Sequence, residues 1–358
     1  MKILRNKMKI IISENRGAVV ITVALILGVL VSMTALTVDI GYGLVTRTQL
    51  HAIADGSALA GTRQLGLVYE GLTTAEQQNY TLSSVGQQAI TTMVISVGQA
   101  NEAGGHAITI NDGDIQVGRW DFEAQTFTAG LNSPNAVRVT ARRDRAANGP
   151  IVTFFAGIMG INTINVSATA TAALGALSTT NVGDLPAPIG ISEFWYTQGE
   201  WCGESIKFHP TGDLEGCAAW HTYEDHPSNA RRLRNIIDGL EDQSYKSPET
   251  QAGYSSFEFI GGDVASAFSN FQELYETRKY DDEPHDTWAT SVVVYDRDDC
   301  SNPNKDILIV GFAKVEIYEV LGPPEKTIKA TVLCNEYEAG RSSGTNFGVM
   351  GTIPGLVQ

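Results

Sequence analysis

The chain has 358 residues, of which 43% are hydrophobic, and a formal net charge of −15. This length and apolar content suffice for more than one buried core, and the strong negative charge argues against nucleic acid or an anionic lipid surface as a ligand. Because the first 17 residues carry a net charge of +4, the rest of the chain carries −19.

The N-terminal tail is basic and is followed by an apolar stretch. The charged residues of the tail are Lys2, Arg5, Lys7, Lys9, Glu14 and Arg16. Residues 18–38 carry no charge, and a helix of that length, at about 1.5 Å per residue, crosses the roughly 30 Å hydrocarbon core of a bilayer. We therefore predict a transmembrane span over 18–38, a cytoplasmic tail over 1–17, and an external location for the chain after Asp39. A cleaved secretory signal is the alternative, although its apolar core is ordinarily about 7–15 residues.

Helical spacing continues beyond the span, because no proline occurs before Pro134 and apolar residues recur on one side. That side consists of Ile40, Leu44, Leu50 or Ala54, Ala58 and Leu65. We predict one helix over residues 18–66, apolar all round in its first half and amphipathic in its second. The hydroxyl groups inside the span can bond to the preceding turn of their own helix. These belong to Thr22, Ser32, Thr34 and Thr37.

Four features of this region occur together. They are Arg16-Gly17 before the span, the span itself, Val38-Asp39-Ile40-Gly41 at its end, and the Ala-rich spacing Gln49-Leu50…Ala54-Asp55…Ala58-Leu59-Ala60. In this combination the region resembles the N-terminal segment of the TadE/TadG-like proteins of bacterial tight-adherence (Tad, or Flp) pilus systems. The family's middle region is expected to continue to about residue 176. The resemblance implies a TadG-like pseudopilin, in which a long helix carries a small globular head.

The resemblance also bears on cleavage and on packing. Prepilin-like members are cut after a Gly and carry Glu five positions into the mature chain, but counting from Ala18 places Thr22 there. Cleavage between Gly17 and Ala18 is thus a candidate event, and retention of the tail is the expectation. Small residues would let helices of other pilus or assembly subunits approach closely. These are Gly28, Ser32, Ala35, Gly41 and Gly43.

Residues 67–176 show the order helix, strand, strand, helix, strand, which predicts an α+β head with helices on one side of a sheet. Thr73 or Thr74 can cap the first helix, and Pro150 is placed to open a second helix over the apolar residues that follow. Strands are expected over 114–128, 136–142 and 163–174, since apolar and polar residues alternate in the last two.

Residues 177–190 are rich in Gly, Ser, Thr and Pro, and we predict a linker there. Residues 191–358 then form a predicted second external domain, β-rich with two helices. The first helix is expected to end at Leu240 after a cap at Ser228 or Asn229, and the second to begin at a cap on Asp263.

The last part of this domain is expected to be strands. The stretches SVVVYD, DILIVGFAKVEIYEV and TIKATVLCNEY alternate or run apolar, and the last two are separated by Gly322-Pro323-Pro324, which predicts an antiparallel hairpin. From Arg341 onward the chain is rich in Gly and Ser, and we expect a poorly ordered end.

All four cysteines lie in this domain: Cys202, Cys217, Cys300 and Cys334. An even number in an oxidising compartment predicts disulfides, and four cysteines allow three connectivities. We prefer Cys202–Cys217 and Cys300–Cys334, because each pair falls within one local stretch. Zinc is the competing explanation, but no close CxxC pair occurs.

Patterns typical of catalysis or of metal binding are incomplete throughout the chain. Residues 340–344 match GxSxG around Ser342, but no helix pattern and no His follow it. His209, His221 and His226 lack a spacing such as HExxH, and the acidic loop 296–306 departs from the calcium-loop pattern. We therefore predict no catalytic, cofactor or metal site, and no enzyme.

Two function classes remain. The first is a non-enzymatic, minor pseudopilin-like component of a Tad/Flp-type pilus assembly or secretion system. It would cross the bacterial inner membrane once, face the periplasm, and contact other pilus or secretion subunits rather than nucleic acid or a small-molecule substrate. The alternative is a membrane-tethered adhesion or ligand-binding protein that uses exposed Trp195, Trp201 and Trp220. A periplasmic hydrolase is disfavoured by the incomplete catalytic patterns.

Overall fold

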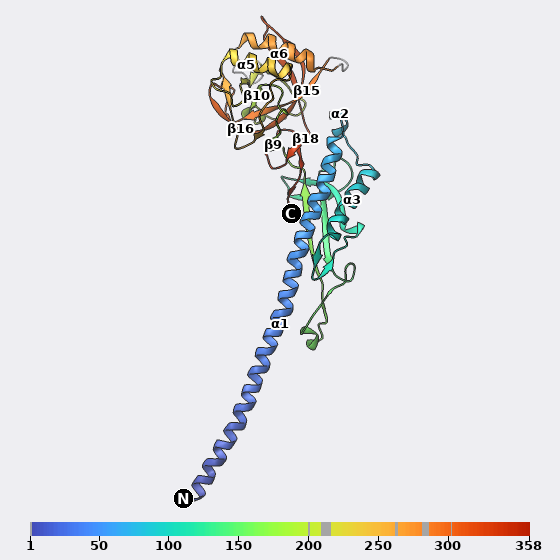
Figure 1. The fold of residues 1–358 in the computed structure, drawn as a ribbon, viewed down its shortest axis with the longest axis vertical. Helices are drawn as coiled ribbons and strands as arrows, with labels where there is room; N and C mark the ends of the chain where they lie inside the picture. Colours follow the sequence, from blue (N-terminus) through green and yellow to red (C-terminus); the bar gives the residue numbers. More distant parts are fainter. Residues whose placement is uncertain (1, 200, 209–215, 262–263, 281–285, 302) are drawn as a thin grey trace. The chain divides into compact units, whose positions relative to one another are not determined.

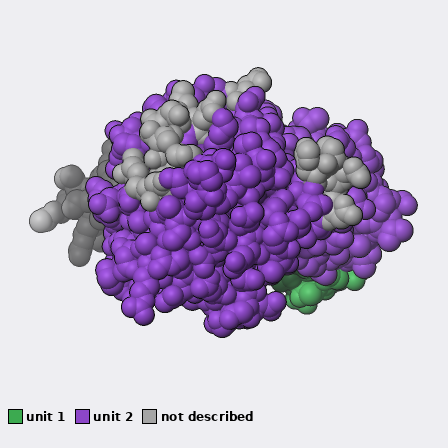
Figure 2. Space-filling view, turned by 90° about the horizontal axis from the view of Figure 1, so that it is seen from above, with its two compact units in different colours: residues 1–57, 94–115, 139–170 green, residues 58–93, 116–138, 171–358 purple. Residues whose placement is uncertain are grey.

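The computed structural model describes residues 2–199, 201–208, 216–261, 264–280, 286–301 and 303–358, with only the backbone described for residues 2–18. The chain divides into two compact units (Figure 2). Unit 1 comprises Met1–Ser57, Val94–Ile115 and Val139–Ala170. Unit 2 comprises Ala58–Met93, Gln116–Arg138 and Thr171–Gln358. The predicted domain boundaries stay a prediction.

Helix α1 (Lys2–Glu70) is a single unbroken helix (Figure 1), so the predicted continuation of the apolar stretch into a longer helix is confirmed. Most of the predicted apolar side is fully buried, namely Leu50, Ala54, Ala58 and Leu65. Ile40 and Leu44 are instead more than half exposed. The buried face of the helix is therefore polar at Asp39 and Thr46 and becomes apolar from Leu50, about three turns after the apolar stretch ends.

Unit 1 combines the first part of α1 with short elements. These are the end of α3 (Ser84–Gln99), the pair β1 (Glu102–Ala103) and β2 (His106–Ala107), the 3-10 helix η1 (Asp112–Asp114), the pair β6 (Ile151–Val152) and β7 (Thr163–Ile164), and the 3-10 helix η2 (Ala156–Met159). The predicted α-helix after Pro150 is wrong, since this segment is a hairpin with η2 at its tip. Gly157 lowers helix propensity there, and Gly160 has a left-handed φ of 83° that ends the short helix.

A five-stranded sheet has the order β20-β8-β5-β3-β4. Its strands are β3 (Ile115–Asp121), β4 (Thr126–Ala129), β5 (Ala136–Arg143), β8 (Val166–Ala173) and β20 (Gly355–Leu356). The single strand predicted over 114–128 is in fact the β3–β4 hairpin, because the Asp121 carboxylate accepts hydrogen bonds from Glu123 and Ala124 and closes a turn. Chain segments of β5 and β8 belong to both units, as do those of α1 and α3.

Most of unit 2 is built on a second sheet. Its strands are β10 (Ile189–Ser192), β11 (Ser205–Phe208), β12 (Ala218–His221), β14 (Ser256–Ile260), β15 (Trp288–Tyr295), β16 (Asp306–Leu321) and β17 (Thr327–Leu333). β16 pairs with both β14 and β15, and β10 pairs with both β12 and β15, so these five strands close on themselves. The predicted β16–β17 hairpin is confirmed.

Two helices accompany this sheet, as predicted. α5 (Ala230–Glu241) begins after Asn229, whose side chain accepts a hydrogen bond from the Arg232 amide at 3.0 Å. α6 (Ala265–Arg278) buries Phe268, Phe271 and Leu274. Asp263, the predicted cap of α6, lies outside the described residues.

The remaining elements of unit 2 are short. They are α2 (Thr74–Gln77), α4 (Glu193–Tyr196), β9 (Thr179–Thr180), β13 (Thr250–Gln251), β18 (Glu336–Arg341) and β19 (Val349–Ile353). The prediction of a poorly ordered end after Arg341 is wrong, because β18 pairs with β19 and β20 pairs with β8. The segment 177–190 buries Leu177, Leu185 and Ile189 in the core of unit 2.

Candidate functional site

The apolar stretch of α1 exposes its side chains on every face. From Val19 to Val38 the large apolar side chains are exposed, and Ala35 is half-buried. Among the described residues, α1 is the one helix long and apolar enough to cross a membrane. A continuous apolar surface of this extent requires a cover of lipid or of another protein.

Hydroxyl groups inside this stretch are satisfied by the helix itself. Ser32 donates to the Gly28 carbonyl at 2.8 Å, and Thr34 and Thr37 donate to the carbonyls four residues earlier at 2.9 and 2.8 Å. This confirms the prediction for these three residues. The stretch therefore presents few unpaired polar groups to an apolar surrounding.

Asp39 ends the apolar stretch and holds a distant segment of unit 1. Its carboxylate accepts hydrogen bonds from the backbone N–H groups of Phe154, Phe155 and Ala156 at 2.7, 2.9 and 2.6 Å. The side chain is 2% exposed. These three donors lie at the start of η2, where no helical carbonyl is available to them. Asp39 thus attaches the β6–β7 hairpin to α1.

The electrostatics of Asp39 follow from this geometry. Burial raises the pKa of the carboxyl, but the three backbone N–H donors outweigh burial and hold the pKa below its ordinary value of 3.8. The group is therefore a carboxylate near neutral pH, which is the form that accepts all three bonds.

Polar side chains near Asp39 fasten a second segment of unit 1. The Tyr42 hydroxyl donates to the Gly104 carbonyl at 3.0 Å, and the Gly104 amide donates to the Gln49 side chain at 2.9 Å. Buried Arg143 donates to the Ala103 carbonyl at 2.8 Å. Gly104 has a φ of 58°, and a side chain there would meet Thr46 and Arg143 at 3.1–3.2 Å. Unit 1 is thus held to α1 by hydrogen bonds directly after the apolar stretch.

Three of the residues predicted to pack against partner helices are glycines with open space beside them in this chain. A Cβ atom at Gly28, Gly41 or Gly43 would have nothing within 4 Å. Ala35 instead lines a groove with Phe155, so its small side chain also admits the hairpin of its own chain. Contact of these residues with partner helices, and cleavage between Gly17 and Ala18, stay predictions.

Sequence reasoning placed Asp39 only as the edge of the apolar stretch and missed its partner. A signal for the contact was present in the residues Pro150 to Thr163, which are apolar and contain no charged side chain. Backbone N–H groups in such a segment require an acceptor, and Asp39 is a carboxylate located where the apolar stretch ends. The donors and the acceptor are more than a hundred residues apart in the sequence, so no local pattern predicts that they meet.

The preferred disulfide pairing is wrong. The bonds are Cys202–Cys334 and Cys217–Cys300. Antiparallel pairing of β11 with β17 brings the stretch before β11 to the end of β17, where the Gly203 amide donates to the Val332 carbonyl at 2.9 Å. Proximity along the chain was therefore a poor guide, since strand pairing sets which cysteines meet.

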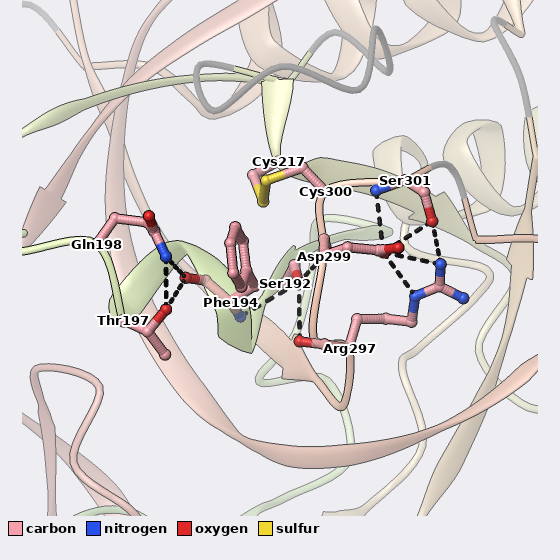
Figure 3. The surroundings of a disulfide bond; sticks show 9 residues. All are labelled: Ser192, Phe194, Thr197, Gln198, Cys217, Arg297, Asp299, Cys300 and Ser301. Atoms are coloured by element: carbon pink, nitrogen blue, oxygen red, sulfur yellow. Dashed lines mark hydrogen bonds and ion pairs between the residues drawn. A yellow bond between two sulfur atoms is a disulfide. The ribbon is translucent and has the colours of Figure 1, made fainter.

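The second bridge is supported by a local hydrogen-bond network (Figure 3). The Ser192 amide donates to the Cys217 carbonyl at 3.0 Å, and the Ser192 hydroxyl donates to the Asp299 carbonyl at 2.9 Å. The carboxylate of Asp299 accepts from Arg297 at 2.9 Å and from the Ser301 hydroxyl at 2.7 Å, and these donors lower its pKa. One carboxylate of the acidic loop, that of Asp299, is thus hydrogen-bonded to neighbouring side chains of the same loop.

The remaining sequence candidates have structural partners. The Ser342 hydroxyl donates to the Ile353 carbonyl. His221 is fully buried, accepts from the Tyr223 amide at 3.2 Å, and has its pKa lowered to about 3 by burial. His209 lies outside the described residues. Within the described ranges, no group of three or more His, Cys, Asp or Glu residues could hold a metal ion.

The three tryptophans of the alternative function are not exposed. Trp220 is buried and packs edge-on against Phe268 and Phe271 of α6. Trp195 and Trp201 are partly buried, and both rings pack against Tyr196. Trp220 is therefore not part of an exposed aromatic surface, and only part of each ring of Trp195 and Trp201 contributes to one.

Comparison with known proteins covers the first half of the chain. Residues 17–64 match a family model described as Flp pilus-assembly TadE/G-like, and residues 60–172 match one described as Tad-like Flp pilus-assembly. The matched residues include the apolar stretch, Asp39 and the β6–β7 hairpin. Neither a curated protein nor a solved structure matches the chain.

Proposed function

Since residues 17–172 carry TadE/G-like and Tad-like Flp pilus-assembly domains, we propose that the protein is a membrane-anchored, non-enzymatic component of a Tad/Flp-type pilus assembly or secretion system. Its role is that of a minor, pseudopilin-like subunit. The observation that carries this proposal is α1, whose exposed apolar stretch continues without a break into a half that is packed within the folded units. A helix of this kind joins a membrane anchor rigidly to the folded part.

The distribution of charge and cysteine supports the orientation. The excess of Lys and Arg before residue 18 places the tail in the cytoplasm, so the chain after Asp39 lies in the periplasm. Both disulfides are in the part that this orientation places in an oxidising compartment. The tail is retained, because Thr22 occupies the position at which prepilin-like proteins carry Glu.

In this role the protein acts by contact. The glycines at 28, 41 and 43 are open in this chain and allow helices of pilus or assembly subunits to approach α1 closely. The acidic periplasmic part provides the second contact surface for pilus or secretion-channel components. Asp39 and Tyr42 fasten other segments of unit 1 to α1 close to where the helix leaves the bilayer.

Topology is tested in spheroplasts of the producing bacterium, with tags at both ends of the full chain. We expect protease to remove the C-terminal tag and spare the N-terminal one, and the protein to stay with the membrane after an alkaline wash. A soluble protein, or a protected C-terminal tag, would contradict the anchor and the orientation. Intact-mass measurement checks retention of residues 1–17.

The pilus role is tested by photo-crosslinking from the span. A crosslinking amino acid at Gly28 should capture a pilus or assembly subunit, and deletion of the gene should reduce piliation. A crosslinking amino acid at Val85, a well-exposed residue of α3, is the matched control for a surface without an assigned partner. Normal pili in the deletion strain would refute the role in assembly even if the anchor were correct.

A further inference from the structure

The tip of the β6–β7 hairpin is an exposed apolar surface in unit 1. Ile158 is 89% exposed, Met159 is 74% exposed and Phe154 is 66% exposed, and Val152 and Ile161 are also exposed. No charged side chain occurs from Pro150 to Thr163. Soluble surfaces rarely gather so many large apolar side chains in one short segment, so this tip is expected to be covered.

Several backbone N–H groups of the tip are hydrogen-bonded within the tip. Thr153 donates to the Asn162 carbonyl, and Ile158, Gly160 and Ile161 donate to carbonyls within the tip at 3.0 Å. The Thr153 hydroxyl also donates to the Ile161 carbonyl. At the start of η2, the N–H groups of Phe154, Phe155 and Ala156 donate hydrogen bonds to the Asp39 carboxylate. Pairing of these N–H groups lowers the free-energy cost of moving the tip into a medium without water.

The tip lies beside the apolar stretch of α1 (Figure 1). Phe155, Ile158 and Met159 line one groove with Val31, Ser32, Ala35 and Leu36, and Met159 lines another that extends along α1 to Ala24. Val31 precedes Val38 by about two turns, or about 10 Å along the helix. The tip therefore reaches back past Asp39 by about the depth at which interfacial segments enter a bilayer.

We propose that the hairpin tip, residues 152–161, inserts into the leaflet on the Asp39 side of the membrane as a second, non-spanning anchor. The occupant of this apolar surface is the acyl-chain region of the lipids that surround the α1 span. This inference rests on the proposed function, because the tip can enter a bilayer only if the stretch of α1 beside it crosses that bilayer. Tyr42, packed edge-on against Phe154 at 5.6 Å, lies at the height where aromatic rings favour the interface.

A second attachment point would fix the rotation of α1 about its own axis in the membrane. A single span is free to rotate about its axis, whereas a tip inserted on one side fixes which face of α1 is turned toward lipid. Asp39 transmits this constraint, since it bonds α1 to the tip.

The test uses the full chain, in which all four cysteines are paired, so an added cysteine is the only free thiol. Ile158→Cys is labelled with an environment-sensitive fluorophore in phosphatidylcholine vesicles that contain lipids with a nitroxide on the acyl chain. Leu30→Cys in the span is the positive control. Gly113→Cys in η1 of unit 1, where a side chain meets nothing within 4 Å, is the negative control.

We expect the label at 158 to show blue-shifted emission and nitroxide quenching close to those at 30, while the label at 113 stays water-like and unquenched. A water-like label at 158 with a quenched label at 30 would overturn the inserted tip and leave the anchor intact. That result would leave a protein partner as the candidate cover of the tip. A water-like label at 30 would refute the proposed anchor itself, and the inserted tip with it.

Discussion

Units 1 and 2 differ in the burial of their large apolar side chains. Unit 2 buries Phe257, Phe268 and Phe312 in one core, shared by its closed sheet and helix α6, and contains two disulfides. Unit 1 leaves the α1 span and the hairpin tip exposed, and its backbone is held by hydrogen bonds to the Asp39 carboxylate and from the Arg143 guanidinium. The difference indicates that unit 2 is stabilised by its own core, whereas the exposed apolar surface of unit 1 requires a cover, which we propose to be lipid and other subunits.

Two phenylalanine substitutions test this contrast most strongly. Phe268→Ala removes a buried ring beside Trp220 and should lower the free energy of unfolding of unit 2 by about 3–5 kcal/mol. Phe154→Ala, in the exposed tip of unit 1, should change it by less than about 0.5 kcal/mol. Denaturation is followed by tryptophan fluorescence, since all five tryptophans lie in unit 2. Equal effects of the two substitutions would contradict the contrast.

Removal of a disulfide should be the next largest effect. The Cys217→Ala/Cys300→Ala double variant opens a loop with a sequence separation of 83 residues and should lose about 2–5 kcal/mol of unfolding free energy. Cys202→Ala/Cys334→Ala, with a separation of 132, serves as the matched variant. The emission of a label at position 158 should not change in either variant. A loss of tip insertion in either variant would contradict the prediction that the disulfides stabilise unit 2 alone.

Acid should weaken unit 2 through His221. Burial lowers its pKa from 6.5 to about 3, so the neutral form is favoured by folding. The stability that follows is complete above pH 6.5 and is lost as the pH falls toward 3, by up to about 1.4 kcal/mol per pH unit. His221→Gln should flatten this slope in denaturation curves measured from pH 7 to 4. Glu336, whose pKa burial raises to about 7, has the opposite dependence, so only the difference between variant and parent isolates His221.

Loss of the Asp39 contact should have the smallest effect on the free energy of unfolding, and its effect should be confined to the hairpin tip. Since its pKa is lowered, the contact is complete above the ordinary value of 3.8 and is lost only as the pH falls below it. Asp39→Asn, which lacks the charge, should release the tip and reduce lipid quenching at position 158 while tryptophan denaturation curves stay unchanged. A pH-dependent release of the tip between pH 7 and 5 would be inconsistent with this assignment.

Much of the fold was predictable because neighbouring residues encode it. The uncharged run before Asp39, the spacing of Leu50, Ala58 and Leu65, and the Asn229 cap each act over a few turns, and the structure confirms all of them. The same local reasoning failed after Pro150. There the backbone N–H groups bond to Asp39 across the chain, and this contact overrides a weak helical pattern.

A long apolar helix, a β-rich C-terminal part and disulfide-bonded cysteines could be predicted from the sequence, because hydropathy and period are properties of adjacent residues. Tertiary contacts were needed to establish which cysteines pair, how β10, β15 and β16 close the sheet, and that Asp39 holds the hairpin tip beside the span. These contacts join residues far apart in the chain. Several alternative pairings satisfy the same local patterns, and packing of the whole chain selects among them.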